Sequence, residues 1–255
     1  PNYPDWGLRD SMVIRGTTGD SLVANPSPHI QSPSGYQQLH LLQKFLFKPN
    51  PQQSHLLNMQ LSTSTDIPRY DRLSQTRDGR LRFAEWFYGP QERFLASYRF
   101  LDKARNGKKA YDELSLTAAY QFIEESRHDR AFNSLWREQQ VEQVQVASLN
   151  LDLQKGFGLR HRLSYGMEGR YNYVRSTAIA EQIETGETLS IQTRYPAGGT
   201  HFAAGAAYAT YYLDLRHNLI FQSGARLSYL NLSSKLDNSG LWDLPFAELT
   251  QENLA

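Results

Sequence analysis

The most regular pattern in the chain is the alternation of apolar and polar side chains over Leu159–Val174. Successive side chains of an extended strand point to opposite faces, so this pattern predicts a strand with one apolar and one charged face. The segment is far longer than an ordinary strand of a soluble domain, which has roughly five or six residues. A strand that crosses a membrane needs about nine to eleven tilted residues, apolar toward lipid and polar toward a lumen. The pattern therefore favours a transmembrane β-strand.

Seven further segments have strand-like patterns, and together with the first they predict an all-β, antiparallel fold. They are Tyr36–Lys48, His55–Thr65, Glu92–Leu101, Asp112–Glu124, Gln139–Gln154, His201–Leu215 and Asn218–Leu232. The apolar phase of one of them shifts between Val146 and Ala147, which predicts a β-bulge there. The proline-rich start of the chain predicts an extended loop with one short strand at Met12–Arg15.

The connections between these segments alternate in length. The short or moderate ones are Pro49–Ser54, Asp102–Tyr111, Gly156–Gly158 and Arg216–His217, and the long ones are Asp66–Gln91, Glu125–Glu138, Arg175–Thr200 and the segment from Ser233 onward. Outer-membrane barrels have short periplasmic turns and long extracellular loops. We therefore predict part of an antiparallel transmembrane β-barrel. Residues 1–35 would be an outer loop or irregular segment, 36–232 the barrel strands with long outer loops, and 233–255 the start of a further outer loop.

Composition excludes several other classes of protein. A formal net charge of +1 over 255 residues gives no reason to expect a nucleic-acid partner. The absence of cysteine excludes disulfides and thiolate metal sites. The first ten residues lack the basic start and apolar core of a signal peptide, so we expect either a removed signal or an internal piece.

The sequence contains few motifs typical of catalysis or of metal or cofactor binding. We therefore predict no catalytic residues, no metal site and no cofactor. The seven histidines have no metalloprotease-like spacing. The charged run Arg127–Arg130 is interpreted as a solvated loop tip, because such clusters are common on loops. Gly156–Gly158 predicts a tight turn rather than a phosphate-binding loop, since no helix follows it.

The stretch that begins at His55, HLLNMQLSTSTDIPRYDRLSQTRDGRLRFAEWFYGPQERFLASYRF, resembles the barrel of TonB-dependent outer-membrane receptors, specifically a group common in Bacteroidetes-type bacteria. The similarity continues through Tyr120–Arg130, Arg175–Glu187, Thr193–Pro196 and Leu244–Leu249. It spans most of the chain from about Gly35 onward.

The resemblance implies a twenty-two-stranded barrel with an N-terminal plug, energised by an inner-membrane TonB complex. No plug segment can be seen here, so we expect a central slice of such a receptor, without the plug. The expected partners are outer-membrane lipid, the TonB system through a plug outside this chain, and a small-molecule ligand.

The resemblance points to haem as the first candidate cargo, with siderophores and cobalamin as alternatives. A soluble β-rich glycan-binding module and a passive porin-like channel are the remaining rivals. Ligand contacts are expected in Asp66–Gln91, because arginine and aromatic side chains dominate binding hot spots. The candidate contacts are Arg69, Tyr70, Arg72 and Trp86, with His128 and His201 as weaker ones.

The alternation also predicts which side chains face lipid. Those expected to contact lipid are Leu163, Tyr165, Tyr171, Leu219, Phe221, Leu227 and Tyr229. Those expected to line the interior are Arg160, Arg162, Glu168, Arg170, Gln222 and Arg226. Tyrosines 165, 171, 173, 211 and 212 are expected to form aromatic rims at the membrane interface.

Overall fold

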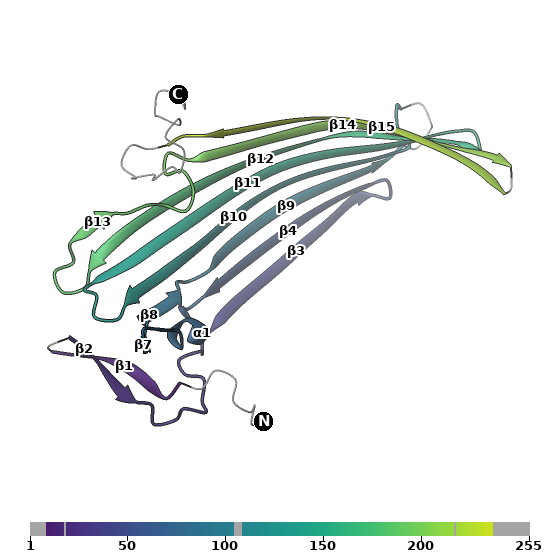
Figure 1. Ribbon diagram of the computed structural model, residues 1–255. Helices are drawn as coiled ribbons and strands as arrows, with labels where there is room; N and C mark the ends of the chain where they lie inside the picture. The colour runs from purple at the N-terminus through teal and green to yellow at the C-terminus, as the bar shows by residue number, and fades with distance from the viewer. Residues whose placement is uncertain (1–8, 18, 105–108, 217, 237–255) are drawn as a thin grey trace.

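A computed structural model describes residues 9–17, 19–104, 109–216 and 218–236, and its main feature is a curved antiparallel sheet of long strands (Figure 1). Its hydrogen-bonded order is β15-β14-β12-β11-β10-β9-β4-β3. The bounds are β3 Gln38–Asn50, β4 Gln53–Ser64, β9 Glu92–Lys103, β10 Glu113–Ala131, β11 Trp136–Phe157, β12 His161–Gln182, β14 Thr200–Arg216 and β15 Leu219–Ser234. All eight predicted strands are confirmed, and each pairs with its neighbour along the chain.

The strand register places the predicted apolar positions on one face of the sheet. One row of directly paired residues crosses all eight strands as Phe45, Leu57, Tyr98, Ala118, Leu149, Gly169, Gly205 and Tyr229. The next row, on the opposite face, is Lys44, Asn58, Ser97, Ala119, Ser148, Arg170, Ala204 and Leu230. Directly paired residues share a face. We call the first the apolar face and the second the polar face.

Two local predictions are wrong, and Arg160 lies just outside its expected strand. Residues on both sides of Val146 and Ala147 stay in continuous register with β10 and β12, so no bulge forms there. The apolar phase shifts because Ile123, Val144 and Val174 sit side by side across three strands of the polar face, as a local cross-strand cluster. Tyr212 pairs with Arg162 and therefore belongs to the polar face. Arg160 lies in the turn before β12 rather than in the strand.

The two ends of the sheet differ, as predicted. Short turns at one end join β3 to β4, β11 to β12 and β14 to β15. At the other end, Glu125–Glu138 was expected to be a long loop, and this prediction is wrong. β10 continues to Ala131 and β11 begins at Trp136, so the hairpin extends beyond the ends of its neighbours. β12 likewise continues to Gln182, and β13 (Thr188–Ser190) pairs with it.

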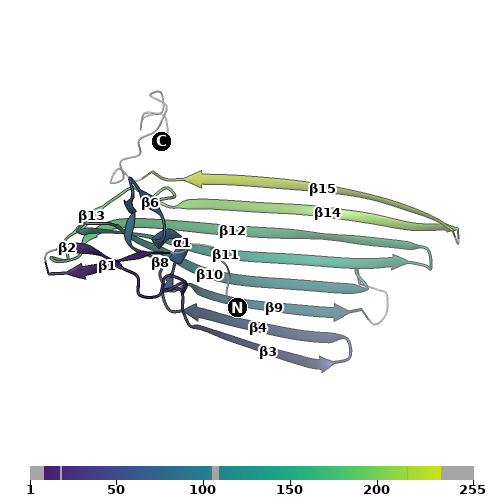
Figure 2. The same cartoon turned by 60° about the horizontal axis from the view of Figure 1, so that its bottom comes forward.

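The connection Asp66–Gln91 is a folded element at this long-loop end (Figure 2). It contains β5 (Ile67–Pro68), α1 (Tyr70–Leu73), β6 (Thr76–Arg77), β7 (Arg80–Leu81) and β8 (Phe83–Tyr88). Beyond the start of β9, β8 takes over as the neighbour of β10. Leu73, Phe83 and Trp86 form a small buried core with Tyr88 packed against it.

Gly89 makes the change from β8 to β9 possible. Its N–H donates to the carbonyl of Ser126 over 3.1 Å. An added Cβ would lie 2.1 Å from the Ser126 hydroxyl and 2.9 Å from Nε2 of His128. A side chain at position 89 would fit only if the side chains of Ser126 and His128 moved aside, so glycine allows the close approach of this backbone to β10.

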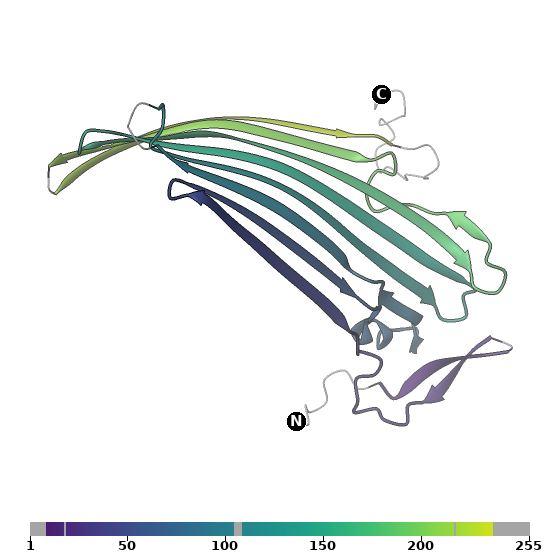
Figure 3. The same cartoon turned by 180° about the vertical axis from the view of Figure 1, so that it is seen from behind.

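The N-terminal part holds a hairpin of β1 (Ser11–Gly16) and β2 (Gly19–Ala24), seen from behind in Figure 3. One short strand was predicted here, and the second strand pairs with it. No helix among the residues described is long and apolar enough to cross a membrane. The predicted motif Leu244–Leu249 and most of the segment 233–255 lie outside the described residues.

Candidate functional site

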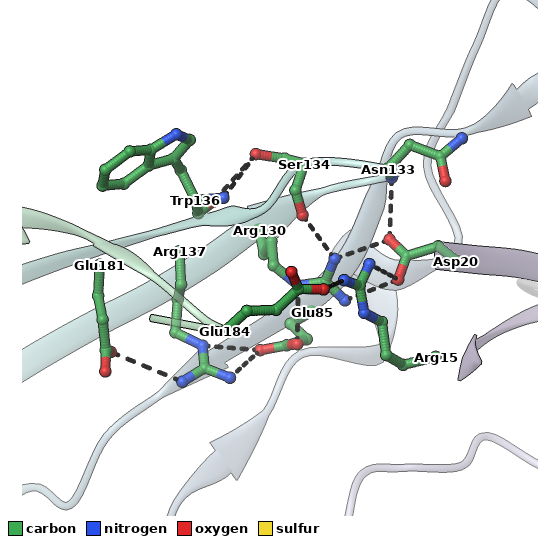
Figure 4. A network of polar contacts seen from close by, with 10 residues as sticks. All are labelled: Arg15, Asp20, Glu85, Arg130, Asn133, Ser134, Trp136, Arg137, Glu181 and Glu184. Atoms are coloured by element: carbon green, nitrogen blue, oxygen red, sulfur yellow. Dashed lines mark hydrogen bonds and ion pairs between the residues drawn. The ribbon is translucent and has the colours of Figure 1, made fainter. Parts of the chain in front are cut away.

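A buried ionic network fastens the β1–β2 hairpin to the long-loop end of the sheet (Figure 4). Arg130 of β10 donates two hydrogen bonds to the Asp20 carboxylate, at 2.7 and 3.1 Å, and one to Glu85 of β8 at 2.8 Å. The side chain of Arg130 is 2% exposed and that of Asp20 is 0% exposed. Arg137 of β11 donates to the second oxygen of Glu85 at 2.8 Å. Hairpin, β8, β10 and β11 are thus joined through two arginines and two carboxylates.

Electrostatics at Asp20 favour the charged carboxylate. Burial alone would raise the pKa of Asp20, but hydrogen bonds from Arg130, from the Asn133 backbone N–H at 2.9 Å and from Arg15 act in the opposite direction. The net result is a pKa below the usual value of 3.8. Since a charge-assisted hydrogen bond is roughly twice as strong as a neutral one, the pair holds the hairpin in place while Asp20 stays ionised.

The interpretation of Arg127–Arg130 as a solvated loop tip is wrong. These residues belong to β10, and the strand alternation sends them to two different surroundings. Arg127 and Asp129 pair with Tyr88 and Trp86 on the polar face, whereas His128 and Arg130 pair with Phe87 and Glu85 on the other. Arg130 contacts Asp20 of the hairpin on one side of the strand, while Arg127 and Asp129 line a polar groove, described below, on the other.

Two of the predicted ligand contacts, Arg69 and Arg72, surround the ring of Trp86. The guanidinium of Arg69 lies 5.5 Å from the Trp86 ring centroid and 5.2 Å from that of Tyr88, and Arg72 lies 5.6 Å from Trp86. Arg69 also donates two hydrogen bonds to the Asp71 carboxylate in a bidentate ion pair, and a third to the Tyr88 hydroxyl at 2.8 Å. The hydrogen bonds that Asp71 accepts raise the pKa of Arg69 and lower that of Asp71.

The predicted aromatic contacts are mostly buried in the folded loop. Trp86 and Tyr70 are each 7% exposed, so most of their surface already packs against protein. The structure thus brings Arg69, Arg72, Tyr70 and Trp86 into one folded loop, and their role in ligand binding stays a prediction.

The two predicted histidines lie apart from this loop's core. His128 stacks on Phe87 with ring centroids 4.7 Å apart, and its Nε2 is 3.0 Å from the Ser126 hydroxyl. His201 pairs with Tyr173 on the apolar face and contacts the Tyr171 hydroxyl at 2.5 Å. Their role as ligands also stays a prediction. Within the described part of the chain, no group of three or more His, Asp or Glu side chains could hold a metal ion.

An open groove of about 870 Å³ lies between the β6–β7 hairpin and the polar face of β10 and β11. Its basic lining residues are Arg72, Arg77, Arg80, Arg82 and Arg127, and its acidic ones are Asp78, Asp129 and Glu138. A second hollow of about 430 Å³ shares Arg127 and Glu138 and extends to Arg194. Arg80 and Arg82 lie within the predicted contact segment Asp66–Gln91 but were not among its candidate contacts, and Arg127 was expected in a solvated loop tip. No sequence pattern near these residues indicates the groove. It forms only because β8 pairs with β10 and brings the loop next to the strand.

Comparison with known proteins gives a likeness of fold. No family model matches the sequence, and no curated protein matches it. A solved structure titled "Copper transporter OprC" aligns with a TM-score of 0.55 over 78% of this chain at 9% identity. The chain spans 29% of that protein's length. This likeness concerns the fold: the sheet is part of an antiparallel transmembrane β-barrel, as predicted.

Proposed function

We propose that the chain forms part of an outer-membrane, TonB-dependent importer of a scarce nutrient, with haem or another iron complex as the first candidate cargo. The observation that carries this proposal is the two-faced sheet. One face is predominantly apolar across eight strands, with a few polar side chains such as Gln43 and Gln145, while the other leads to a folded, arginine-rich loop at the long-loop end. Lipid on one side and a water-filled lumen on the other account for both faces. Barrel closure would require strands beyond β3 and β15.

The proposed activity is binding followed by energised movement, without catalysis. The loop that contains Arg69 and Arg72 would capture the cargo at the outer mouth, because arginine forks pair with carboxylates such as the two propionates of haem. A plug driven by the TonB system would then admit the cargo. An anionic siderophore would use the same arginines, whereas cobalamin carries amides and would need neither. The copper in the neighbour's title is not transferred to this chain, because 9% identity supports only a shared fold.

Uptake measurements in a strain that lacks the gene test the proposal. We expect the strain to lose growth on haem as its only iron source, and the complete gene to restore it. Addition of a proton uncoupler should abolish uptake, which separates an energised importer from a passive porin. Uptake that continues in the uncoupled cells, or unchanged growth of the deletion strain, would contradict the proposal. A protein that stays monodisperse without detergent would favour the soluble glycan-binding module.

A further inference from the structure

We propose that the groove between the β6–β7 hairpin and the polar face of β10 binds an elongated small molecule that carries two or more carboxylate or phosphate groups. The inference deepens the proposed function and rests on it, because it names the class of ligand that the long-loop end would capture. It concerns Arg80, Arg82 and Arg127 in addition to the arginines of α1 and its flank.

The charge of the groove is the first argument. Five arginines line it against three carboxylates, which leaves an excess of two positive charges around one hollow. The whole chain has a formal net charge of only +1, so this excess is a local feature. An anion entering the groove therefore meets a positive potential that the walls of the hollow concentrate.

The way in which these arginines are paired is the second argument. Among the described residues, the only ion pairs of the groove arginines are Arg77 with Asp78 at 3.9 Å and Arg72 with Asp71 at 4.0 Å. The arginines of the ionic network have carboxylate oxygens at 2.5 to 2.8 Å. The same end of the molecule thus contains one set of tightly paired arginines and another set whose carboxylates, Asp129 and Glu142 included, attract them over a longer range.

Two buried donor atoms point to the same conclusion. Nε of Arg72 and Nε of Arg127 are both buried without a hydrogen-bond partner in the described residues. Both side chains line the groove. Buried polar groups normally have partners, and each exception calls for a physical cause. Carboxylate or phosphate oxygens in the groove would provide acceptors in the geometry that a guanidinium prefers.

The shape of the site indicates an elongated ligand. The second hollow joins the groove at Arg127 and Glu138 and adds Arg194, so positive groups extend along the polar face past the edge of the first hollow. A ligand with anionic groups at both ends could pair with arginines in each. The groove lies on the face opposite the apolar rows, which favours a free molecule in the lumen over a lipid headgroup.

Calorimetry on the complete protein in detergent tests the proposal. The probes are tripolyphosphate and propane-1,2,3-tricarboxylate, with acetate as the single-charge comparison. We expect at least one of the two polyanions to bind, and Arg80→Gln with Arg127→Gln to weaken that binding by at least tenfold. The matched control is Arg160→Gln with Arg216→Gln, which removes the same charge from exposed positions at the short-turn end and should change little.

The outcomes that overturn the proposal are distinct. Absence of binding by either polyanion at millimolar concentration would overturn it, as would an equal loss in both double variants, which would reflect net charge alone. Unchanged affinity in the groove variant, with a wild-type gel shift on heating, would also overturn it. A groove variant that loses anionic-lipid micelles but keeps tripolyphosphate would assign the arginines to lipid instead. Polyanion binding without energised haem uptake would contradict the proposed cargo and leave this site standing.

Discussion

Arg130 and Asp20 lie 110 positions apart in the sequence, yet they share two hydrogen bonds of 2.7 and 3.1 Å in a buried pair. This contact joins the N-terminal hairpin to the extended part of β10. Removing one partner of a buried pair typically costs about 3–5 kcal/mol, and the remaining bond of Arg130 to Glu85 at 2.8 Å places the cost of losing Asp20 at the lower end. Since the contact joins the hairpin to β10 and is no part of the hydrogen bonding between the strands of the main sheet, the cost falls on hairpin docking.

The first prediction concerns this docking. Asp20→Ala should release the β1–β2 hairpin, with a loss of about 3 kcal/mol in the free energy of docking. Hydrogen exchange at the hairpin amides should become fast, while amides of β11 and β12 keep their protection. Asp78→Ala is the control, because its side chain is 94% exposed and its ion pair is long. Equal protection in both variants would show that the pair does not hold the hairpin.

The second prediction concerns pH. The pKa of Asp20 lies below its usual value of 3.8, so the carboxylate contributes to docking at every pH above that value. The contribution is lost as the pH falls through the lowered pKa, because protonation removes the charge that Arg130 binds. A fluorescent label on the hairpin should therefore report release only below about pH 4. In Asp20→Asn this acid transition should disappear, and its persistence would assign it to another group.

The third prediction concerns the two faces of β12. Spin labels at Leu163 and Arg162 should differ in surroundings, because adjacent residues of a strand point to opposite sides. We expect the label at 163 to be accessible to oxygen dissolved in lipid and the label at 162 to a water-soluble nickel complex. The reverse pattern would mean that the register between β12 and its neighbours is shifted by one residue.

The fourth prediction concerns the cost of charge on the apolar face. Leu227 lies in the middle rows of that face, paired with Ala207, and is 80% exposed. Leu227→Arg should destabilise the complete protein in bilayers by about 2–4 kcal/mol, the usual cost of arginine at mid-depth. Ser228→Arg places the same charge on the polar face and should cost much less. Urea unfolding in lipid vesicles measures both, and equal losses would contradict a lipid-facing role for Leu227.

The fifth prediction concerns haem. In the complete receptor, Arg69→Ala with Arg72→Ala should lower the affinity for haem, because both side chains lie over Trp86 at the mouth-side loop. Absorbance of bound haem should shift in His128→Ala or His201→Ala if that histidine ligates iron. Titration of haem into each variant measures both effects. Unchanged affinity in the double arginine variant would remove this loop from the binding site.

Sequence alone determined the strands of the sheet and its two faces. The period-two pattern in Leu159–Val174 recurs in the other strands with the same phase relation, and register follows once each strand pairs with the next. The register is well specified because one face is predominantly apolar, so a slip of one residue would move the apolar side chains to the other face. The alternation pattern gave a wrong prediction at Val146. The apolar side chains clustered across strands on the polar face there change the phase of the pattern without a change of register.

Tertiary structure alone decided the long-loop end. Glu125–Ala131 shows no alternation because protein lies against both of its faces, with the hairpin's Asp20 on one and the arginine groove on the other. The pairing of Asp20 with Arg130, and of β8 with β10, depends on contacts between segments far apart in sequence. Such contacts leave no periodic mark on either segment. For that reason the strands could be predicted from the sequence, while the charged site at their ends required the folded chain.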